Sequence, residues 1–163
     1  MKTQKIYNLV ILDASGSMHS IYNQALSGVN ETLATIRMAQ EDHPELQQKV
    51  THEDRVLVTI ITDGYENASR TWSGKQIKSL VQELRQMGWT FTYIGADQDV
   101  EKVAETIGVQ NSLRFSANAE ETKVMFAKER KCRNKFYDKM SMFLAEAAPC
   151  ANLKESDDYF DDI

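Results

Sequence analysis

The sequence predicts an α/β fold with three layers, in which a mostly parallel, Rossmann-like sheet of about four strands is flanked by helices. Short apolar runs of strand length alternate with longer segments of helical periodicity along the chain. This alternation is typical of βαβ units that build a parallel sheet. The chain has 163 residues, of which 42% are hydrophobic and 26% are charged, so it is long enough to bury one core of ordinary size.

The first half of the chain contributes two predicted strands and one helix. The run from Tyr7 to Leu12 is almost entirely apolar, as expected for a strand buried on both faces of a parallel sheet. A helix is predicted from Ser20 to about Gln40, and the pair His43-Pro44 ends it. The second strand, Arg55 to Ile61, is rich in β-branched residues. The apolar face expected for the helix consists of Ile21, Ala25, Val29, Leu33 and Ile36.

The second half contributes two more strands and three helices. Ser73 and Gln76 have the spacing of a capping box, and Gly88 is a natural stop for the helix that follows them. The expected apolar stripe of this helix is Ile77, Leu80, Val81, Leu84 and Met87. The remaining predicted elements are strands at Trp89 to Ile94 and Leu113 to Phe115, a short helix at Val100 to Ile107, and a long helix from the Asn118 cap to about Ala147.

Composition limits the domain organisation and the classes of function. Residues 1–150 are expected to form one domain, and the acidic residues 151–163 a disordered tail. A formal net charge of −5 argues against nucleic acid and anionic membranes as partners. No apolar run approaches the ~20 residues that a membrane-spanning helix needs. Cys132 and Cys150 are too few for a disulfide framework, so we interpret both as reduced thiols and expect a cytoplasmic protein.

Polar residues follow the first two predicted strands. Asp13, Ser15 and Ser17 come after the first strand, and Asp63 comes after the second. The carboxyl ends of parallel strands meet at one edge of a sheet, so we expect these four side chains to come together. Their hydroxyl and carboxylate oxygens suit Mg²⁺, or alternatively Mn²⁺ or Ca²⁺, better than zinc. Gly16 is expected to let the loop turn sharply, so that both hydroxyls face inward.

These motifs carry a resemblance to a known family. The segment Asp13-Ala14-Ser15-Gly16-Ser17-Met18, directly after a buried strand, resembles the metal-site motif of von Willebrand factor A (vWA) domains. Ile61-Thr62-Asp63-Gly64 resembles the second metal segment of that family, and Gly95 fits its next loop. The stretch from Asp63 to Ser69 is similar to bacterial and phage members. The order of elements from residue 5 to about 147 is compatible with a vWA-like fold.

The resemblance implies a metal-ion-dependent adhesion site (MIDAS). Ser15 and Ser17 would bind the ion directly, and Asp13 and Asp63 directly or through water. A Glu or Asp carboxylate of a protein partner would complete the coordination. The implied function is a divalent-metal-dependent protein-binding module and not an enzyme. Two alternatives remain, a Mg²⁺-dependent phosphatase-like hydrolase with Asp13 as the nucleophile and a metal-free structural remnant of a vWA domain.

The chain departs from the family between the first helix and the second strand. Members of the family usually have two further strands there, with a loop threonine as the third metal segment. Here Asp42 to Asp54 form a short linker, and Thr51 belongs to the opposite edge of the sheet. We therefore expect weakened metal binding. The missing hairpin would also leave Lys5 to Leu12 as an edge strand, which favours association, as a homodimer for instance. Alternatively, the chain is a natural or engineered shortened version of a longer protein.

Other conspicuous residues have simpler interpretations. The basic run from Lys128 to Lys135 is expected to be a solvated helix face and not a nucleic-acid site. Asp97 and Asp99 are interpreted as helix caps, not as metal ligands. Trp72 and Trp89 are expected to be packing residues.

Overall fold

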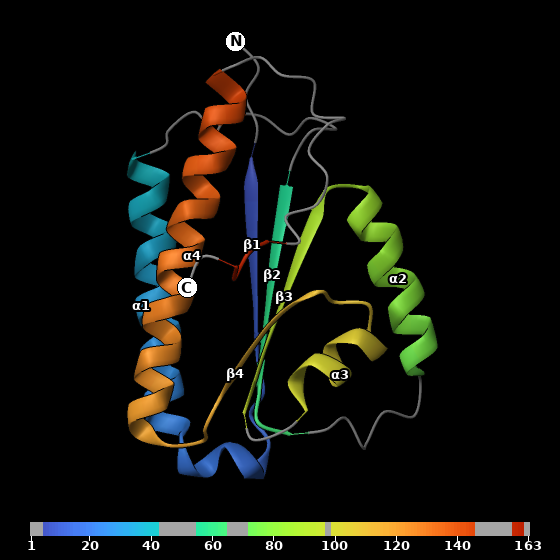
Figure 1. Cartoon of the computed structure of the whole chain (residues 1–163). Helices are drawn as coiled ribbons and strands as arrows, with labels where there is room; N and C mark the ends of the chain where they lie inside the picture. The colour runs from blue at the N-terminus through green and yellow to red at the C-terminus, as the bar shows by residue number, and fades with distance from the viewer. Residues whose placement is uncertain (1–4, 43–54, 65–71, 97–98, 146–157, 162–163) are drawn as a thin grey trace.

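The computed structural model describes residues 5–42, 55–64, 72–96, 99–145 and 158–161. Within these ranges the chain forms a single sheet with helices on both sides (Figure 1). All the strands and helices predicted from the sequence are present, and their ends differ from the predicted ends by no more than two residues. The elements are β1 (Ile6–Leu12), the 3₁₀ helix η1 (Gly16–Ser20), α1 (Tyr22–Asp42), β2 (Arg55–Thr62), α2 (Gly74–Gln86), β3 (Trp89–Ala96), α3 (Val100–Thr106), β4 (Asn111–Phe115) and α4 (Ala119–Ala145).

The sheet has the strand order β1-β2-β3-β4, and every neighbouring pair is parallel. This arrangement confirms the predicted α/β class with a Rossmann-like sheet of four strands. Because the strands are parallel, the carboxyl ends of β1 and β2 lie at the same edge, where Leu12 pairs with Ile61. β1 and β4 are the two outer strands of the sheet.

Helices cover both faces of the sheet and complete the three layers (Figure 1). α1 and α4 pack against one face around a core that includes Ile21, Ile94 and Phe126. α2 and α3 pack against the other face around Val58, Val81 and Phe91. A Cβ atom on Gly28 of α1 would lie 2.1 Å from the ring of Phe126, so the close approach of α1 to α4 requires glycine at this position.

The predicted helix caps are confirmed at two helices. The Ser73 hydroxyl accepts a hydrogen bond from the Gln76 N–H at 3.4 Å, and Gln76 Oε1 accepts one from the Ser73 N–H at 2.8 Å. Asn118 Oδ1 accepts a hydrogen bond from the Glu121 N–H at 2.9 Å. Gly88 has a φ of 88°, in the left-handed region that favours glycine after the end of a helix.

Several expectations about burial and strand ends are wrong. Trp72 is 53% exposed, because it lies outside α2, just before the cap of that helix. Leu33, Leu80 and Met87 are exposed as well. Gly95 belongs to β3 and not to a loop, because β3 is still paired with β4 at this residue. Trp89 is a packing residue as predicted, and its ring stacks on Phe91.

The basic run on α4 is only partly solvated. Its lysines are exposed, but Glu129, Cys132 and Arg133 are buried. Buried positions recur at steps of three and four residues along α4, so the helix turns these residues toward the sheet. The expectation of a solvated face fails because helical spacing, and not net charge, decides which of these side chains point inward.

Arg133 connects α4 to two strands. Its Nε donates to Glu129 Oε1 at 2.8 Å, and its two terminal nitrogens donate to Asn8 Oδ1 at 2.6 Å and Thr59 Oγ1 at 2.7 Å. Burial alone would lower the pKa of Arg133, but the adjacent Glu129 carboxylate raises it above the ordinary value. The guanidinium therefore stays charged, and this buried ion pair is fully hydrogen-bonded, as such pairs must be.

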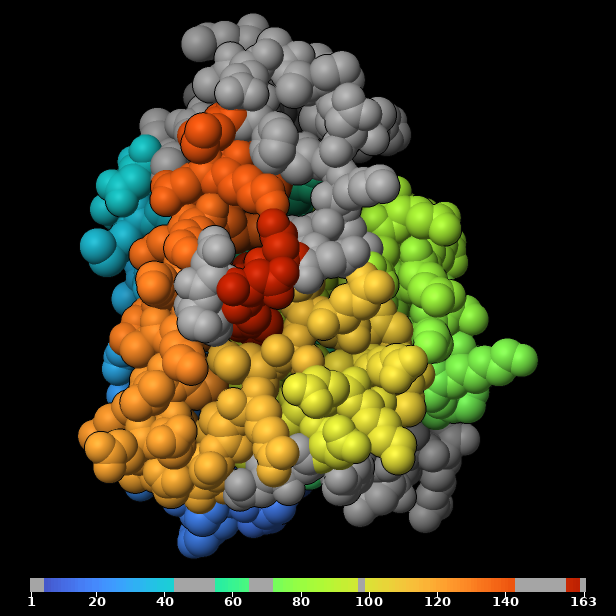
Figure 2. Space-filling model, viewed as in Figure 1, coloured from blue at the N-terminus to red at the C-terminus, as the bar shows by residue number. Residues whose placement is uncertain are grey.

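Part of the predicted tail is ordered. Asp158–Asp161 form a turn, which Figure 2 shows wedged between α4 and the segment that contains β4. Tyr159 is buried, its N–H donates to Asn111 Oδ1 at 3.1 Å, and its hydroxyl donates to Glu129 Oε1 at 3.4 Å. The prediction of a disordered tail is wrong for these residues, because the aromatic pair Tyr159 and Phe160 packs into the core despite the acidic neighbours.

Some predictions fall outside the described residues. These include the helix-ending pair His43-Pro44, the thiol of Cys150 and the placement of Thr51. The side chain of Cys132 is buried. Among the helices of the described ranges, none has both the length and the apolar character needed to cross a membrane.

Candidate metal centre

The four residues predicted to form a site lie at the carboxyl ends of β1 and β2. The N–H of Asp13 donates to the Ile61 carbonyl at 2.9 Å, which extends the pairing of the two strands by one residue. Asp13 therefore leaves the sheet beside Thr62, and Asp63 follows one residue later. The last residues of two paired strands thus position both carboxylates.

Asp13 is held by hydrogen bonds at both carboxylate oxygens. Oδ1 accepts from the Ser15 N–H at 2.8 Å, and Oδ2 accepts from the Thr62 hydroxyl at 2.8 Å. Burial alone would raise the pKa of Asp13, but the hydrogen bonds from Ser15 and Thr62 together hold it below the ordinary value. Asp13 is therefore a fixed negative charge at this edge of the sheet.

A chain of hydrogen bonds joins the other three residues. The Ser15 and Ser17 hydroxyl oxygens lie 2.8 Å apart, and the Ser17 hydroxyl donates to Asp63 Oδ1 at 2.7 Å. This last contact joins residues that are 46 positions apart in the sequence. Both serines are exposed to solvent, while Asp13 and Asp63 are half-buried. The four side chains are thus brought together, with the hydroxyls on the outside.

The loop conformation comes from η1. Ser15 is extended, with φ −67° and ψ 166°, and the 3₁₀ helix that follows reverses the chain. Met18 is buried in the core and anchors this helix. Gly16 does not have a positive φ, and a Cβ atom there would meet nothing within 4 Å. The expected role of Gly16 in a sharp turn is therefore wrong, because the 3₁₀ helix makes the turn.

Thr62 is a site residue that sequence reasoning did not identify. Its hydroxyl donates to Asp13 and accepts from the Gly64 N–H at 3.2 Å. Leu12 pairs with Ile61, so the next residues of the two strands, Asp13 and Thr62, stand side by side with side chains on the same face. The signal that could have identified Thr62 is the strand register, which the sequence alone does not provide.

The oxygen spacing of the cluster fits a small divalent ion. Mg²⁺ prefers octahedral oxygen ligands at about 2.0–2.1 Å, so that neighbouring ligands lie roughly 2.9 Å apart. The Ser15–Ser17 and Ser17–Asp63 oxygen pairs, at 2.8 and 2.7 Å, are close to that spacing. These are also ordinary hydrogen-bond distances, so they are compatible with a bound ion and do not distinguish Mg²⁺ from Ca²⁺. Across the described ranges no group of three or more His, Cys, Asp or Glu side chains could hold a metal.

Two further polar residues, Asp99 and His19, belong to neighbouring helical segments. Asp99 occupies the N-cap position of α3, as predicted, although its side chain makes no capping hydrogen bond. His19 is exposed on η1. Glu66, Asn67, Asp97 and Gln98 lie outside the described residues.

Comparison with known proteins gives no match, whether the chain is compared with protein-family models, with curated proteins or with solved structures. The geometry of the site is therefore the basis for any assignment of function. The resemblance of the two motifs to vWA domains stays a hypothesis.

Proposed function

We propose that this chain is a vWA-like module that binds a divalent cation, preferentially Mg²⁺. The module uses this cation to bind an acidic side chain of a protein partner. In this proposal Ser15 and Ser17 coordinate the ion through their hydroxyl oxygens. Asp13 and Asp63 supply the negative charge, directly or through water. Two carboxylates balance the charge of the ion, and a coordination position that holds water is left for a carboxylate of the partner.

The observation that carries the proposal is the hydrogen bond between Ser17 and Asp63, because it joins the two strand ends. A serine hydroxyl can offer a lone pair to a metal while it still donates its proton to a carboxylate. The contact is therefore compatible with a bound ion. The arrangement also needs little rearrangement when the ion binds, since Asp13 is already held at both oxygens.

The exposure of the serines supports a macromolecular partner. Ser15 and Ser17 face solvent, so a coordination position between them stays open to a ligand from outside. Mg²⁺ keeps water in such positions, and a Glu or Asp carboxylate can replace it. We also propose a cytoplasmic setting, because two cysteines are too few for a disulfide framework.

Calorimetric titration with Mg²⁺, Mn²⁺ and Ca²⁺ tests the metal site. We expect binding of Mg²⁺ and Mn²⁺ in the wild type, weaker binding of Ca²⁺, and loss of binding in Ser17→Ala. Ser20→Ala is the matched control, because Ser20 is an exposed serine of the same 3₁₀ helix outside the cluster. No heat from Mg²⁺ or Mn²⁺ at millimolar ion would favour the metal-free remnant. Mg²⁺-dependent hydrolysis of para-nitrophenyl phosphate would favour the phosphatase-like alternative.

A further inference from the structure

The outer edge of β1 is not covered by any other described strand. β1 is the first strand of the sheet. The Asp13 N–H donates to β2, and the Lys5 carbonyl accepts from it. Backbone groups alternate in direction along a strand, so the odd-numbered residues of β1 bond to β2. The N–H and carbonyl groups of Ile6, Asn8, Val10 and Leu12 therefore point outward.

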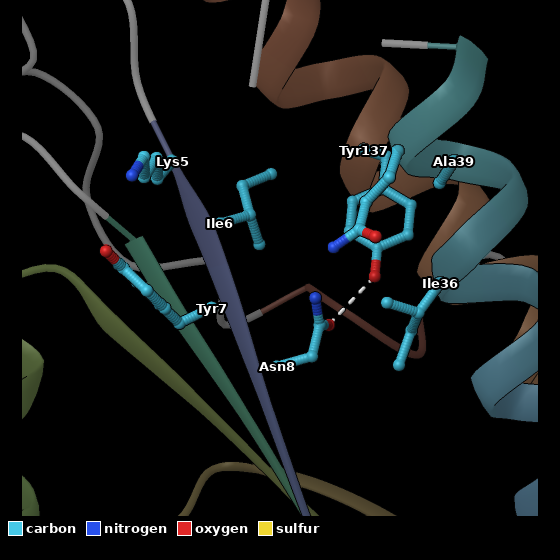
Figure 3. A pocket seen from close by; sticks show the side chains of 8 residues that line it. Lys5, Ile6, Tyr7, Asn8, Ile36, Ala39 and Tyr137 are labelled. Atoms are coloured by element: carbon cyan, nitrogen blue, oxygen red, sulfur yellow. Dashed lines mark hydrogen bonds between the residues drawn. The ribbon is translucent and has the colours of Figure 1, made fainter. Parts of the chain in front are cut away.

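The two faces of β1 differ in how they are covered. Ile6 and Asn8 point toward α1 and Tyr137, whereas Tyr7 points away from them (Figure 3). Tyr7, Leu9 and Ile11 form an apolar row on the opposite face, each between 43% and 46% exposed. The core beneath α2 and α3 includes residues of β2 and β3 but none of β1. α2 therefore leaves this row of β1 open to solvent.

A second apolar row lies on α1 along the same edge. The flank of α1 toward α4 is identified by the ion pair between Glu31 and Arg130 at 2.5 Å. At 100° per residue, Tyr22, Leu26 and Leu33 fall on the opposite flank of α1, on the side away from α4. All three are exposed. Six of the twelve exposed large hydrophobic residues in the described ranges thus gather at one edge of the molecule.

We propose that this open edge, formed by β1 and the outer flank of α1, is the contact surface of a homodimer in which the two β1 strands pair antiparallel. The strand is self-complementary about its centre. When Leu9 lies opposite Leu9 of the second copy, Tyr7 lies opposite Ile11, and the outward groups of Asn8 meet those of Val10. Antiparallel pairs of this kind exchange both hydrogen bonds. All seven residues of β1 are paired in this register.

The absence of protection on the edge favours a second copy as the occupant. Edge strands of monomeric proteins usually carry lysine, proline or a bulge that prevents pairing. The segment Ile6–Leu12 contains no charged residue and no proline. A two-fold axis perpendicular to the sheet also brings the α1 flanks of both copies to the same side of the sheet. Each apolar row of one copy then contacts the same row of the other copy, which is an isologous interface.

The surface available matches a small specific interface. At roughly 150–200 Å² for a fully exposed large side chain, the exposed fractions leave about 60–90 Å² on each of the six residues. Together with the strand backbone, two copies would bury a surface on the order of 1,000 Å², near the lower limit for specific dimers.

A cavity of about 270 Å³ between β1 and α1 lies beside this surface. Its lining includes Tyr137 and Asn8, and the Tyr137 hydroxyl donates a hydrogen bond to Asn8 Oδ1 (Figure 3).

Light scattering over a wide concentration range tests the dimer. We expect the mass to rise from 18.6 kDa toward twice that value. Leu9→Lys should weaken association by about a hundredfold or more, because two lysines would face each other at the dyad and the buried apolar area would be lost. Val124→Lys on α4 is the matched control, since Val124 is 45% exposed and Leu9 46%. A monomer at all concentrations, or a dimer that Leu9→Lys leaves intact, overturns the proposal.

Hydrogen exchange of the wild-type protein gives a second and independent test. In the dimer, the amides of Ile6, Asn8, Val10 and Leu12 should exchange slowly, and they should exchange quickly on dilution to the monomer. The odd-numbered amides should stay protected in both states, because they bond to β2. Slow exchange of the even-numbered amides in a monomer would mean that another segment of the same chain covers the edge, and this result also contradicts the proposal.

Discussion

The oxygen cluster at the ends of β1 and β2 is exposed and contains no basic residue, whereas the cluster around Arg133 is buried and built on an ion pair. In the first, hydroxyls face solvent over two half-buried carboxylates. In the second, the guanidinium is fully enclosed and bonded to α4, β1 and β2. Solvent stabilises the charges of the first cluster, but the second depends entirely on its own partners. We therefore expect the buried cluster to determine stability and the exposed one to determine binding.

The largest effect is expected from removing one member of the buried pair. Arg133→Met leaves the Glu129 carboxylate buried without its cation, which should cost about 3–5 kcal/mol of unfolding free energy. Urea denaturation measures this loss. Replacing both residues, with Glu129→Leu added to Arg133→Met, should recover part of it, because no buried charge then remains. Lys131→Met on the exposed side of α4 is the control and should change stability by less than about 0.5 kcal/mol.

The next largest effect concerns the ordered turn near the end of the chain. Tyr159→Ala removes a buried ring that contacts Phe136, as well as the hydroxyl that bonds to Glu129. We expect a loss of about 2–4 kcal/mol in the same denaturation experiment. An unchanged stability would mean that the turn does not pack against α4 in solution and that the expectation of a disordered tail was right.

A smaller effect is expected at the exposed cluster. Thr62→Val removes the hydrogen bond to Asp13 Oδ2 and should cost about 1 kcal/mol at neutral pH, because water can replace the lost donor. The pKa of Asp13 in the folded state lies below the ordinary value of 3.8. Its contribution to stability is therefore complete above that value and is lost as the pH falls through the folded-state pKa. The difference between wild type and variant should shrink in acid, and a pH-independent difference would contradict the assigned hydrogen bond.

The smallest effect is expected at Gly16. Gly16→Ala should change the unfolding free energy by less than about 0.5 kcal/mol and leave Mg²⁺ binding intact, since the position has space and an ordinary φ. Calorimetry on this variant distinguishes a turn made by the 3₁₀ helix from a turn that requires glycine. A large loss of Mg²⁺ binding would restore the idea that the motif needs glycine for its turn.

The two clusters also differ in how far the sequence predicts them. Asp13, Ser15, Ser17 and Asp63 could be grouped in advance, because each follows a recognisable strand and parallel strands end at one edge. The Arg133 cluster could not, since its contacts to Asn8 and Thr59 span 125 and 74 positions in the sequence. They depend on which face of α4 turns inward. Thr62 was missed for a related reason, because its partner is set by the strand register.

The most direct test of the central claim is to locate the bound ion with Mn²⁺ in a nuclear magnetic resonance titration. Mn²⁺ broadens the signals of nearby nuclei, so substoichiometric Mn²⁺ should first erase the amide signals of Ser15, Ser17, Asp63 and Gly64, and excess Mg²⁺ should restore them. If the first signals lost are instead those of the acidic turn Asp158–Asp161, or if no signal is lost selectively, the ends of β1 and β2 do not form the metal site.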